Sequence, residues 1–149
     1  MEKNNNTHAG SQSVSPSVRQ SLFKTLESVK QQVEYSAFGR MVTRGRGERE
    51  RQILEVDPIY MELCLIMAEI YVMDGETVIK INKEDTPLYI VQEVYQQLGN
   101  RHLETVCTNF KEVTTKIFNK KSYFRTALYN AIFEHEAHYT NAVQSDYWK

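Results

Sequence analysis

The chain has 149 residues, of which 41% are hydrophobic and 25% are charged, and its formal net charge is −1. This length suits one domain with a modest core, and the composition excludes a wholly disordered chain. The sequence has no run of roughly 18 apolar residues, which a membrane-spanning helix requires, and its polar start MEKNNNTHAG does not resemble a secretory signal. We therefore expect a soluble, cytoplasmic protein.

The near-neutral net charge conceals a separation of charges along the chain. Ten acidic and three basic residues lie between Glu55 and Glu104, whereas residues 105–125 contain five basic residues and one acidic residue. A third segment, Arg40 to Arg51, carries five arginines against two glutamates. We expect separate acidic and basic surfaces, which can orient a protein on a charged partner.

The chain begins with residues 1–14, which are rich in Asn, Ser and Gln and predict a disordered leader. Residues 15–149 are expected to form a single helical domain. Its first helix starts at Ser15-Pro16, because serine suits the N-cap and proline the first helical position. Apolar residues then recur three and four positions apart until Val33, which predicts an amphipathic helix ending near Gly39.

The segment 40–52, RMVTRGRGERERQ, combines two glycines with dense charge and has almost no apolar periodicity. It predicts a basic flexible loop or the solvated start of a helix. Asp57-Pro58 then predicts a new helix by the same capping logic, with a core-facing stripe from Ile59 to Ile70. This helix is expected to stop at Asp74-Gly75.

A change of periodicity follows this helix. Residues from Thr77 to Ile81 are β-branched and alternating, residues 82–85 look like a turn, and Thr86-Pro87-Leu88 can form a returning strand. The pattern predicts one short β-hairpin, which needs helices packed against it to be stable.

The next predicted helix spans Ile90 to Leu98 and ends at Gly99, since glycine tolerates the positive φ common after a helix. Asn100 is expected to cap a following helix that extends to Val113. Asn119 is expected to cap a last helix, whose inward apolar residues run from Tyr123 to Ile132.

Beyond His135 the helical pattern weakens, and we expect Tyr139, Tyr147 and Trp148 to pack the tail back onto the body. The predicted elements together indicate a mainly α fold, a compact bundle of about five helices with one short β-hairpin.

Two segments carry a resemblance to a known family. They are Thr114-Thr115-Lys116-Ile117 and the run from Asn119 to Ala131, NKKSYFRTALYNA. The chain resembles the C-terminal domain of replication initiator A proteins, which serve theta-replicating plasmids and integrative elements of Gram-positive bacteria. The order of elements agrees as well, including a segment like Val33-Glu34-Tyr35 and an acidic helix like Ile59 to Tyr71. Thr77, Val78, Ile81 and Pro87 match the family's T-V-x-x-I strand and the proline-led turn after it.

The resemblance covers roughly Val33 to Trp148, and Tyr123 to Tyr129 is more loosely similar to helices that close DnaD-type helicase-loading domains. It implies a part in plasmid DNA replication and host replication proteins as partners. The sequence departs from the family in its more basic segment Arg44 to Arg51. The first 32 residues are also too short for the family's winged-helix DNA reader, so we expect a C-terminal module or a stand-alone relative, without origin recognition.

No residue pattern indicates an enzyme. The chain lacks a G-x-S-x-G motif and a glycine-rich phosphate loop, and Cys64 and Cys107 lie in apolar helical patterns that predict reduced core thiols. The cluster Glu134-His135-Glu136-Ala137-His138 places its histidines three apart instead of the four of H-E-x-x-H, so a metal site is not expected. We predict no cofactor.

Eight basic residues are candidates for contact with nucleic acid or a partner protein. Four of them, Lys116, Lys120, Lys121 and Arg125, precede or begin the last predicted helix, where cations and free N–H groups can hold phosphates. A solvated face is the alternative for this group. The other four are Arg44, Arg46, Arg49 and Arg51, which form either a self-neutralising linker or an arm on the DNA backbone.

Three functions stay open on the sequence. The first is a non-enzymatic interaction module of a replication initiator that contacts host replication proteins, such as helicase-loading machinery, through the helix Ile59 to Tyr71 or the hairpin. The second is an auxiliary nucleic-acid-binding domain that uses the 105–125 patch and the 40–51 arginines. The third is a structural or oligomerising domain. The sequence leaves the oligomeric state open.

Overall fold

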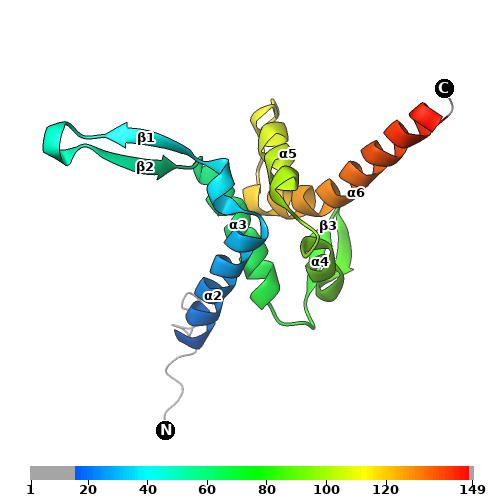
Figure 1. Ribbon diagram of the computed structural model, residues 1–149. Coiled ribbons are helices and arrows are strands. Elements are labelled where there is room, and N and C mark those ends of the chain that lie inside the picture. Colours follow the sequence, from blue (N-terminus) through cyan, green and yellow to red (C-terminus); the bar gives the residue numbers. More distant parts are fainter. Residues whose placement is uncertain (1–15, 148–149) are drawn as a thin grey trace, which may run out of the picture.

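The computed structural model describes the backbone of residues 16–147 and the side chains of residues 17 and 19–134. The predicted leader, residues 1–14, lies outside them. The described part contains five α-helices and two separate antiparallel sheets of two strands each (Figure 1). The prediction of a helix-dominated α+β fold is confirmed, although the part of the chain described has two hairpins where one was expected.

The helices are α2 (Pro16–Gln32), α3 (Pro58–Val72), α4 (Leu88–Tyr95), α5 (Asn100–Lys111) and α6 (Lys120–Tyr147). Two short 3-10 helices are η1 (Tyr35–Phe38) and η2 (Gly47–Arg49). The strands are β1 (Arg40–Arg44), β2 (Arg51–Glu55), β3 (Val78–Ile81) and β4 (Glu84–Pro87). Among the residues described, every helix is too short or too polar to span a bilayer.

Helix α3 is the centre of the core. It contacts each of α2, α4, α5 and α6, and it is apolar on most of its surface, as a helix surrounded by others must be. As predicted, it begins at Asp57, whose carboxylate accepts a hydrogen bond of 3.1 Å from the Ile59 N–H. Leu63 and Met67 are fully buried.

Helix α2 lies beside α3 and ends earlier than predicted. Residue Glu34 has a φ of 53°, in the left-handed region, and this breaks the helix after Gln32, well before Gly39. The side chain of Gln32 donates two hydrogen bonds of 2.9 Å, to the carbonyls of Tyr95 and Leu98. The end of α2 is thereby joined to the end of α4.

The β3–β4 hairpin was predicted and is confirmed. Ile79 and Ile81 are buried on the helix-facing side, which supplies the packing that an isolated hairpin lacks. The turn is shorter than the predicted residues 82–85. Asn82 and Lys83 alone form it, with φ values of 53° and 67°, as in the tight turns that match strand twist.

The connection between α4 and α5 differs from the prediction. Gly99 has an extended backbone with φ −133°, so it is not a left-handed helix end but the N-cap of α5. Its N–H donates a 2.9 Å hydrogen bond to His102 Nδ1. Asn100, predicted as the cap, is the first helical residue and donates instead to the Val33 carbonyl, at 3.0 Å.

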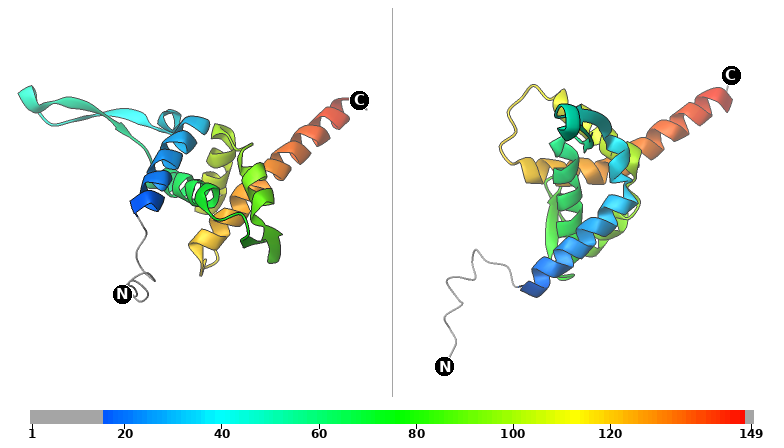
Figure 2. Two further views of the ribbon diagram at one scale, coloured as in Figure 1. Left: turned by 90° about the horizontal axis from the view of Figure 1, so that it is seen from below. Right: turned by 60° about the vertical axis from the view of Figure 1, so that its left-hand side comes forward.

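Helix α6 begins as predicted, because Asn119 Oδ1 accepts a 2.9 Å hydrogen bond from the Ser122 N–H. Its first half packs into the body with Phe124 and Leu128 fully buried. Its second half leads away from the body, as Figures 1 and 2 show, so the backbone does not fold back as predicted. The side chains of Tyr139 and Tyr147, and Trp148, lie outside the described residues.

The prediction of a loop or helix start at 40–52 is wrong. Strands β1 and β2 pair in antiparallel register from Arg40↔Glu55 to Arg44↔Arg51, and the hairpin projects from the body beside α3 (Figure 1). No residue from 40 to 55 is buried. Because neither strand has a buried face, their sequences show no alternation of polar and apolar residues. From sequence alone this charged segment therefore resembles a loop or a helix start.

Candidate nucleic-acid interface

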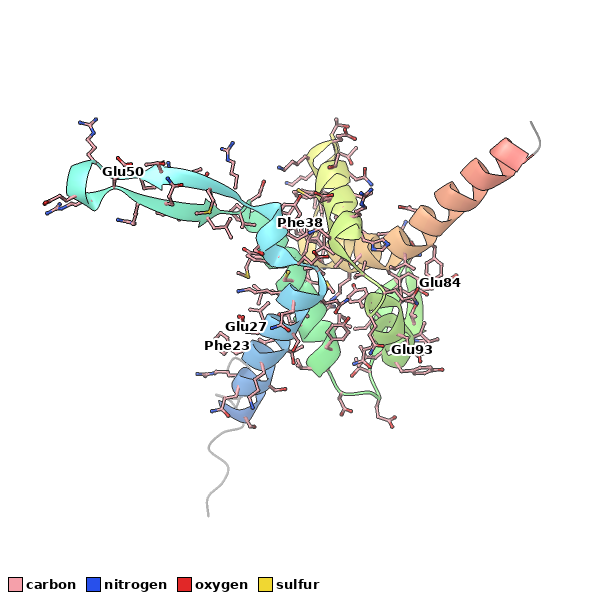
Figure 3. All side chains as sticks on the ribbon, viewed as in Figure 1. Phe23, Glu27, Phe38, Glu50, Glu84 and Glu93 are labelled. Atoms are coloured by element: carbon pink, nitrogen blue, oxygen red, sulfur yellow. The ribbon has the colours of Figure 1, made fainter. Side chains whose placement is uncertain are left out.

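The four arginines of the 40–52 segment gather at the far end of the β1–β2 hairpin. Arg44 ends β1 and Arg51 begins β2 directly opposite, while Arg46 and Arg49 lie in the connection between the strands. All four are exposed. Figure 3 places Phe38 at the base of the hairpin and Glu50 toward its far end, so these arginines are held away from the body.

The connection depends on glycine. Gly45 has a φ of 87°, and a Cβ added there would lie 2.3 Å from the carbonyl oxygen of Arg49. Only a residue without a side chain fits this close approach. The tight fold of the connection therefore fixes where Arg46 and Arg49 emerge.

This end of the hairpin carries like charges on opposite strands, an arrangement that β-sheets usually avoid. Like charges directly opposite one another destabilise a strand pair, yet Arg44 faces Arg51. Glu55 Oε2 contacts Arg44 at 2.5 Å and its other carboxylate oxygen lies 3.9 Å from Arg40. Among the described residues no ion pair reaches Arg46, Arg49 or Arg51. The hairpin end thus keeps uncompensated positive charge.

The second group of candidates does not form one free patch. Lys120 Nζ lies 2.9 Å from Glu62 Oε1 and Lys121 Nζ lies 3.1 Å from Glu69 Oε1, so both lysines contact carboxylates of α3. Lys111 likewise lies 2.7 Å from Asp57. The prediction of separate acidic and basic surfaces is wrong here, because folding brings the two charged segments together.

The two remaining candidates lie in different surroundings. Arg125 is half-buried, and its Nε has no hydrogen-bond partner among the described residues. Lys116 is exposed, and its Nζ lies 5.4 Å from the centre of the Phe118 ring. Only Lys116 of this group is both exposed and not paired with a described acid.

The hypothesis that the acidic helix docks a partner does not fit α3. Most of its apolar side chains belong to the core, and Glu62 and Glu69 face lysines of α6. At its exposed start, Tyr60 stacks on Phe38 with ring centres 3.9 Å apart. The helix therefore holds the fold together instead of offering a free face.

A groove of about 690 Å³ lies between the β3–β4 turn, α5 and α6. Its lining is mostly apolar, with amide and hydroxyl groups from Asn82, Asn109, Thr126 and Asn130 among it. Asn82 and Asn130 exchange two hydrogen bonds of 3.0 Å through their side-chain amides, which anchors the turn to α6. Such groups suit hydrogen bonding to a peptide or small polar ligand.

The two cysteines are free and buried, as predicted. Burial raises the pKa of the Cys64 thiol to about 11, so the thiolate is scarce at neutral pH. Among the described residues no group of three potential metal ligands occurs. The side chains of His135 to His138 lie outside those residues.

Two surface features escaped prediction, the β1–β2 hairpin and the exposed ring of Phe118. For the hairpin a signal existed, because the short apolar or β-branched runs Met41-Val42-Thr43 and Ile53-Leu54 flank the two glycines of the connection. For Phe118 no signal existed, because the local sequence does not distinguish it from nearby apolar residues that belong to the core.

Comparisons with known proteins give one finding. No curated protein and no solved structure shows a significant match to the chain. The model of one family, described as a family of unknown function, DUF6017, matches residues 23–148. The chain therefore belongs to the DUF6017 family.

Proposed function

We propose that this domain is a non-enzymatic binding module that contacts the phosphate backbone of nucleic acid through the β1–β2 hairpin. The observation that carries the proposal is the concentration of Arg44, Arg46, Arg49 and Arg51 at the end of a projecting ribbon, three of them without an ion-pair partner in the described part. Guanidinium groups suit phosphates because their planar N–H groups can donate two parallel hydrogen bonds.

The shape of the hairpin supports this proposal. Paired strands lie about 4.8 Å apart, so a two-stranded ribbon fits a DNA major groove about 12 Å wide. In the free hairpin the like charges of Arg44 and Arg51 repel each other across the strand pair. A bound polyanion would reduce this repulsion. Contacts of the hairpin arginines to phosphates would supply affinity and position the domain, but they would not select a base sequence.

We further propose a biological setting, a plasmid-type replication initiator in the cytoplasm. The support is the resemblance of Thr114 to Ile117 and of Asn119 to Ala131 to the C-terminal domain of replication initiator A proteins. In that setting the arginine hairpin would hold the initiator on DNA while other surfaces meet host replication proteins.

Contact with a host replication protein is the second candidate function, and the groove between the β3–β4 turn, α5 and α6 favours it. Phe133, 48% exposed, lies on α6 next to the groove residue Glu134 and contacts Tyr129 with ring centres 5.3 Å apart. Exposed aromatic rings beside hydrogen-bonding groups are typical of protein interfaces.

The test is the binding of labelled single-stranded and duplex DNA, followed by fluorescence anisotropy between about 50 and 200 mM salt. The variant Arg46→Gln/Arg49→Gln/Arg51→Gln should bind more weakly, and the slope of log K against log salt should shrink by up to about 3. The control variant Arg19→Gln/Lys24→Gln/Arg101→Gln loses the same charge from other exposed positions. Undetectable binding of the unaltered protein at about 50 mM salt, or equal losses in both variants, would reject the proposal.

A further inference from the structure

Phe118 is the most exposed of the large hydrophobic side chains in the described residues, at 89%. Burial of a phenylalanine side chain stabilises a protein by about 1.5–3 kcal/mol, and Phe118 forgoes this in the free chain. Single exposed apolar residues are common, so exposure alone assigns no role. The surroundings of the ring decide what it can bind.

The linker that carries Phe118, residues 112–119, is anchored at both ends. The Val113 N–H donates a 3.2 Å hydrogen bond to the Phe110 carbonyl at its start, and Asn119 caps α6 at its end. Val113 and Ile117 are half-buried and line a small cavity of about 310 Å³ beside Phe110. The linker bulges from the body between α5 and α6, as the right-hand view of Figure 2 shows. Its other apolar groups face inward while Phe118 is left in solvent.

One cation, Lys116, lies beside the ring, and the linker also carries the exposed Glu112. Lys116 Nζ lies 5.4 Å from the ring centre, within cation–π range, and no acid of the described residues pairs with it. The flanking lysines Lys111 and Lys120 pair with carboxylates of Asp57 and Glu62. Lys116 is thus the cation left to meet an anion at the linker.

An exposed aromatic ring beside an unpaired cation matches the chemistry of a nucleotide. A base has a flat face that stacks on an aromatic ring whatever its sequence, and its phosphate attracts an ammonium group. In a duplex both faces of each base are covered by neighbouring base pairs, so only an unpaired base can stack on a protein side chain without first leaving the helix.

We propose that Phe118 and Lys116 form a stacking site for an unpaired nucleobase, so that the domain favours single-stranded nucleic acid over duplex. This inference rests on the proposed contact of the arginine hairpin with nucleic acid, and it adds a second point of contact on a different element. A hydrophobic pocket of a partner protein is the competing occupant, and it predicts no effect of Phe118 on binding of an oligonucleotide.

The test compares Phe118→Ala with Phe23→Ala, which removes another exposed phenylalanine, 68% exposed, from α2. We expect Phe118→Ala to weaken binding of a labelled oligothymidylate about tenfold and to leave duplex binding unchanged. Phe118→Tyr should restore single-strand binding. Lys116→Gln should lower the slope of log K against log salt on single strands by about 0.7. Because Phe118 is almost fully exposed, Phe118→Ala should retain the circular dichroism spectrum of the unaltered protein.

The outcomes separate this inference from the proposed function. If the hairpin variant weakens binding but Phe118→Ala behaves like Phe23→Ala on single strands, the stacking site is rejected and the hairpin proposal stands. Equal losses of Phe118→Ala on single strands and duplex also reject stacking. If the unaltered protein binds neither form of DNA, both proposals are rejected.

Discussion

The hydroxyl of Tyr95, at the end of α4, donates a 2.8 Å hydrogen bond to the backbone carbonyl of Arg125 in α6. Tyr95 is fully buried, and burial raises the pKa of its hydroxyl, which therefore stays protonated as a donor. This hydrogen bond joins α4 to α6, which also pack against each other. It also positions the first turns of α6, which follow the linker that carries Phe118.

Replacement of Tyr95 by phenylalanine should lower the free energy of unfolding by about 1 kcal/mol, because one buried hydrogen bond is lost while the ring still fills its space. Urea denaturation followed by circular dichroism measures the change. Tyr89→Phe is the control, since Tyr89 is 59% exposed and its hydroxyl makes no hydrogen bond among the described residues. Equal losses in the two variants would contradict the importance of the Tyr95 bond.

Gln32 links three elements at once. It donates to the carbonyls of Tyr95 and Leu98, and its Oε1 accepts a 3.1 Å hydrogen bond from the Tyr71 hydroxyl. Gln32→Ala should lower the free energy of unfolding by about 1–3 kcal/mol, because the Leu98 carbonyl loses the Gln32 donor and the Tyr95 carbonyl keeps only the Leu98 N–H. Gln31→Ala changes an exposed neighbour in the same helix and should stay within about 0.5 kcal/mol. The comparison uses thermal or urea unfolding, and similar values for both variants would count against this role of Gln32.

Gly45 and Gly47 both have positive φ, at 87° and 58°, but only Gly45 also lies against the backbone of Arg49. Gly45→Ala should disrupt the β1–β2 connection and remove hydrogen-exchange protection from the strand amides. Gly47→Ala should weaken the local pairing of the hairpin by only about 1 kcal/mol, since a Cβ there meets open space. Global stability should change little in either variant, because no residue of the hairpin is buried. Unchanged protection in Gly45→Ala would show that the connection tolerates a side chain.

The acid stability of the protein should depend on Asp57. The hydrogen bond from Lys111, followed by that from the Ile59 N–H, lowers the pKa of the Asp57 carboxyl below its ordinary value. A lowered pKa in the folded state means that this contribution is present above the unfolded pKa of about 4 and fades as the pH falls through the folded value. Asp57 is exposed, so solvent limits the size of the effect.

Two variants separate the charge of Asp57 from its capping role. Asp57→Asn keeps an N-cap acceptor but removes the charge, so its free energy of unfolding should vary less between pH 5 and 2. Asp57→Ala should lose about 1 kcal/mol at neutral pH as well, because the cap is gone. Unfolding curves collected at several pH values give both quantities. A pH dependence of Asp57→Asn as steep as that of the unaltered protein would contradict the assignment.

Much of the fold follows from local sequence patterns. The starts of α3 and α6 at Asp57 and Asn119, and the pairing of Val78–Ile81 with Glu84–Pro87, are confirmed because caps, turns and alternating β-branched residues act over a few positions. The end of α2 was misplaced because Glu34 adopts a left-handed φ that its residue type does not favour. Gly99 was misread because glycine suits both a left-handed helix end and an extended N-cap.

The candidate site was predictable in composition but not in arrangement. The basic residues of both segments could be named from the sequence, yet the pairing of Lys120 with Glu62 and of Lys121 with Glu69 depends on how α6 crosses α3. Contacts between residues about fifty positions apart leave no trace in local periodicity. The usual pattern could not identify the β1–β2 hairpin, since its strands have neither a buried face nor the alternation of polar and apolar residues that ordinarily marks a sheet.

The ends of the β1–β2 hairpin meet at the surface of the body, where a Cβ at Gly39 would lie 2.8 Å from a methyl group of Val56. The chain thus leaves and rejoins the helices at almost the same point. Insertions, deletions or exchanges of charge within such an appendage need not disturb the packing of α2 on α3. A change of charge within this stretch therefore alters the surface that the domain presents without altering the interior that keeps it folded.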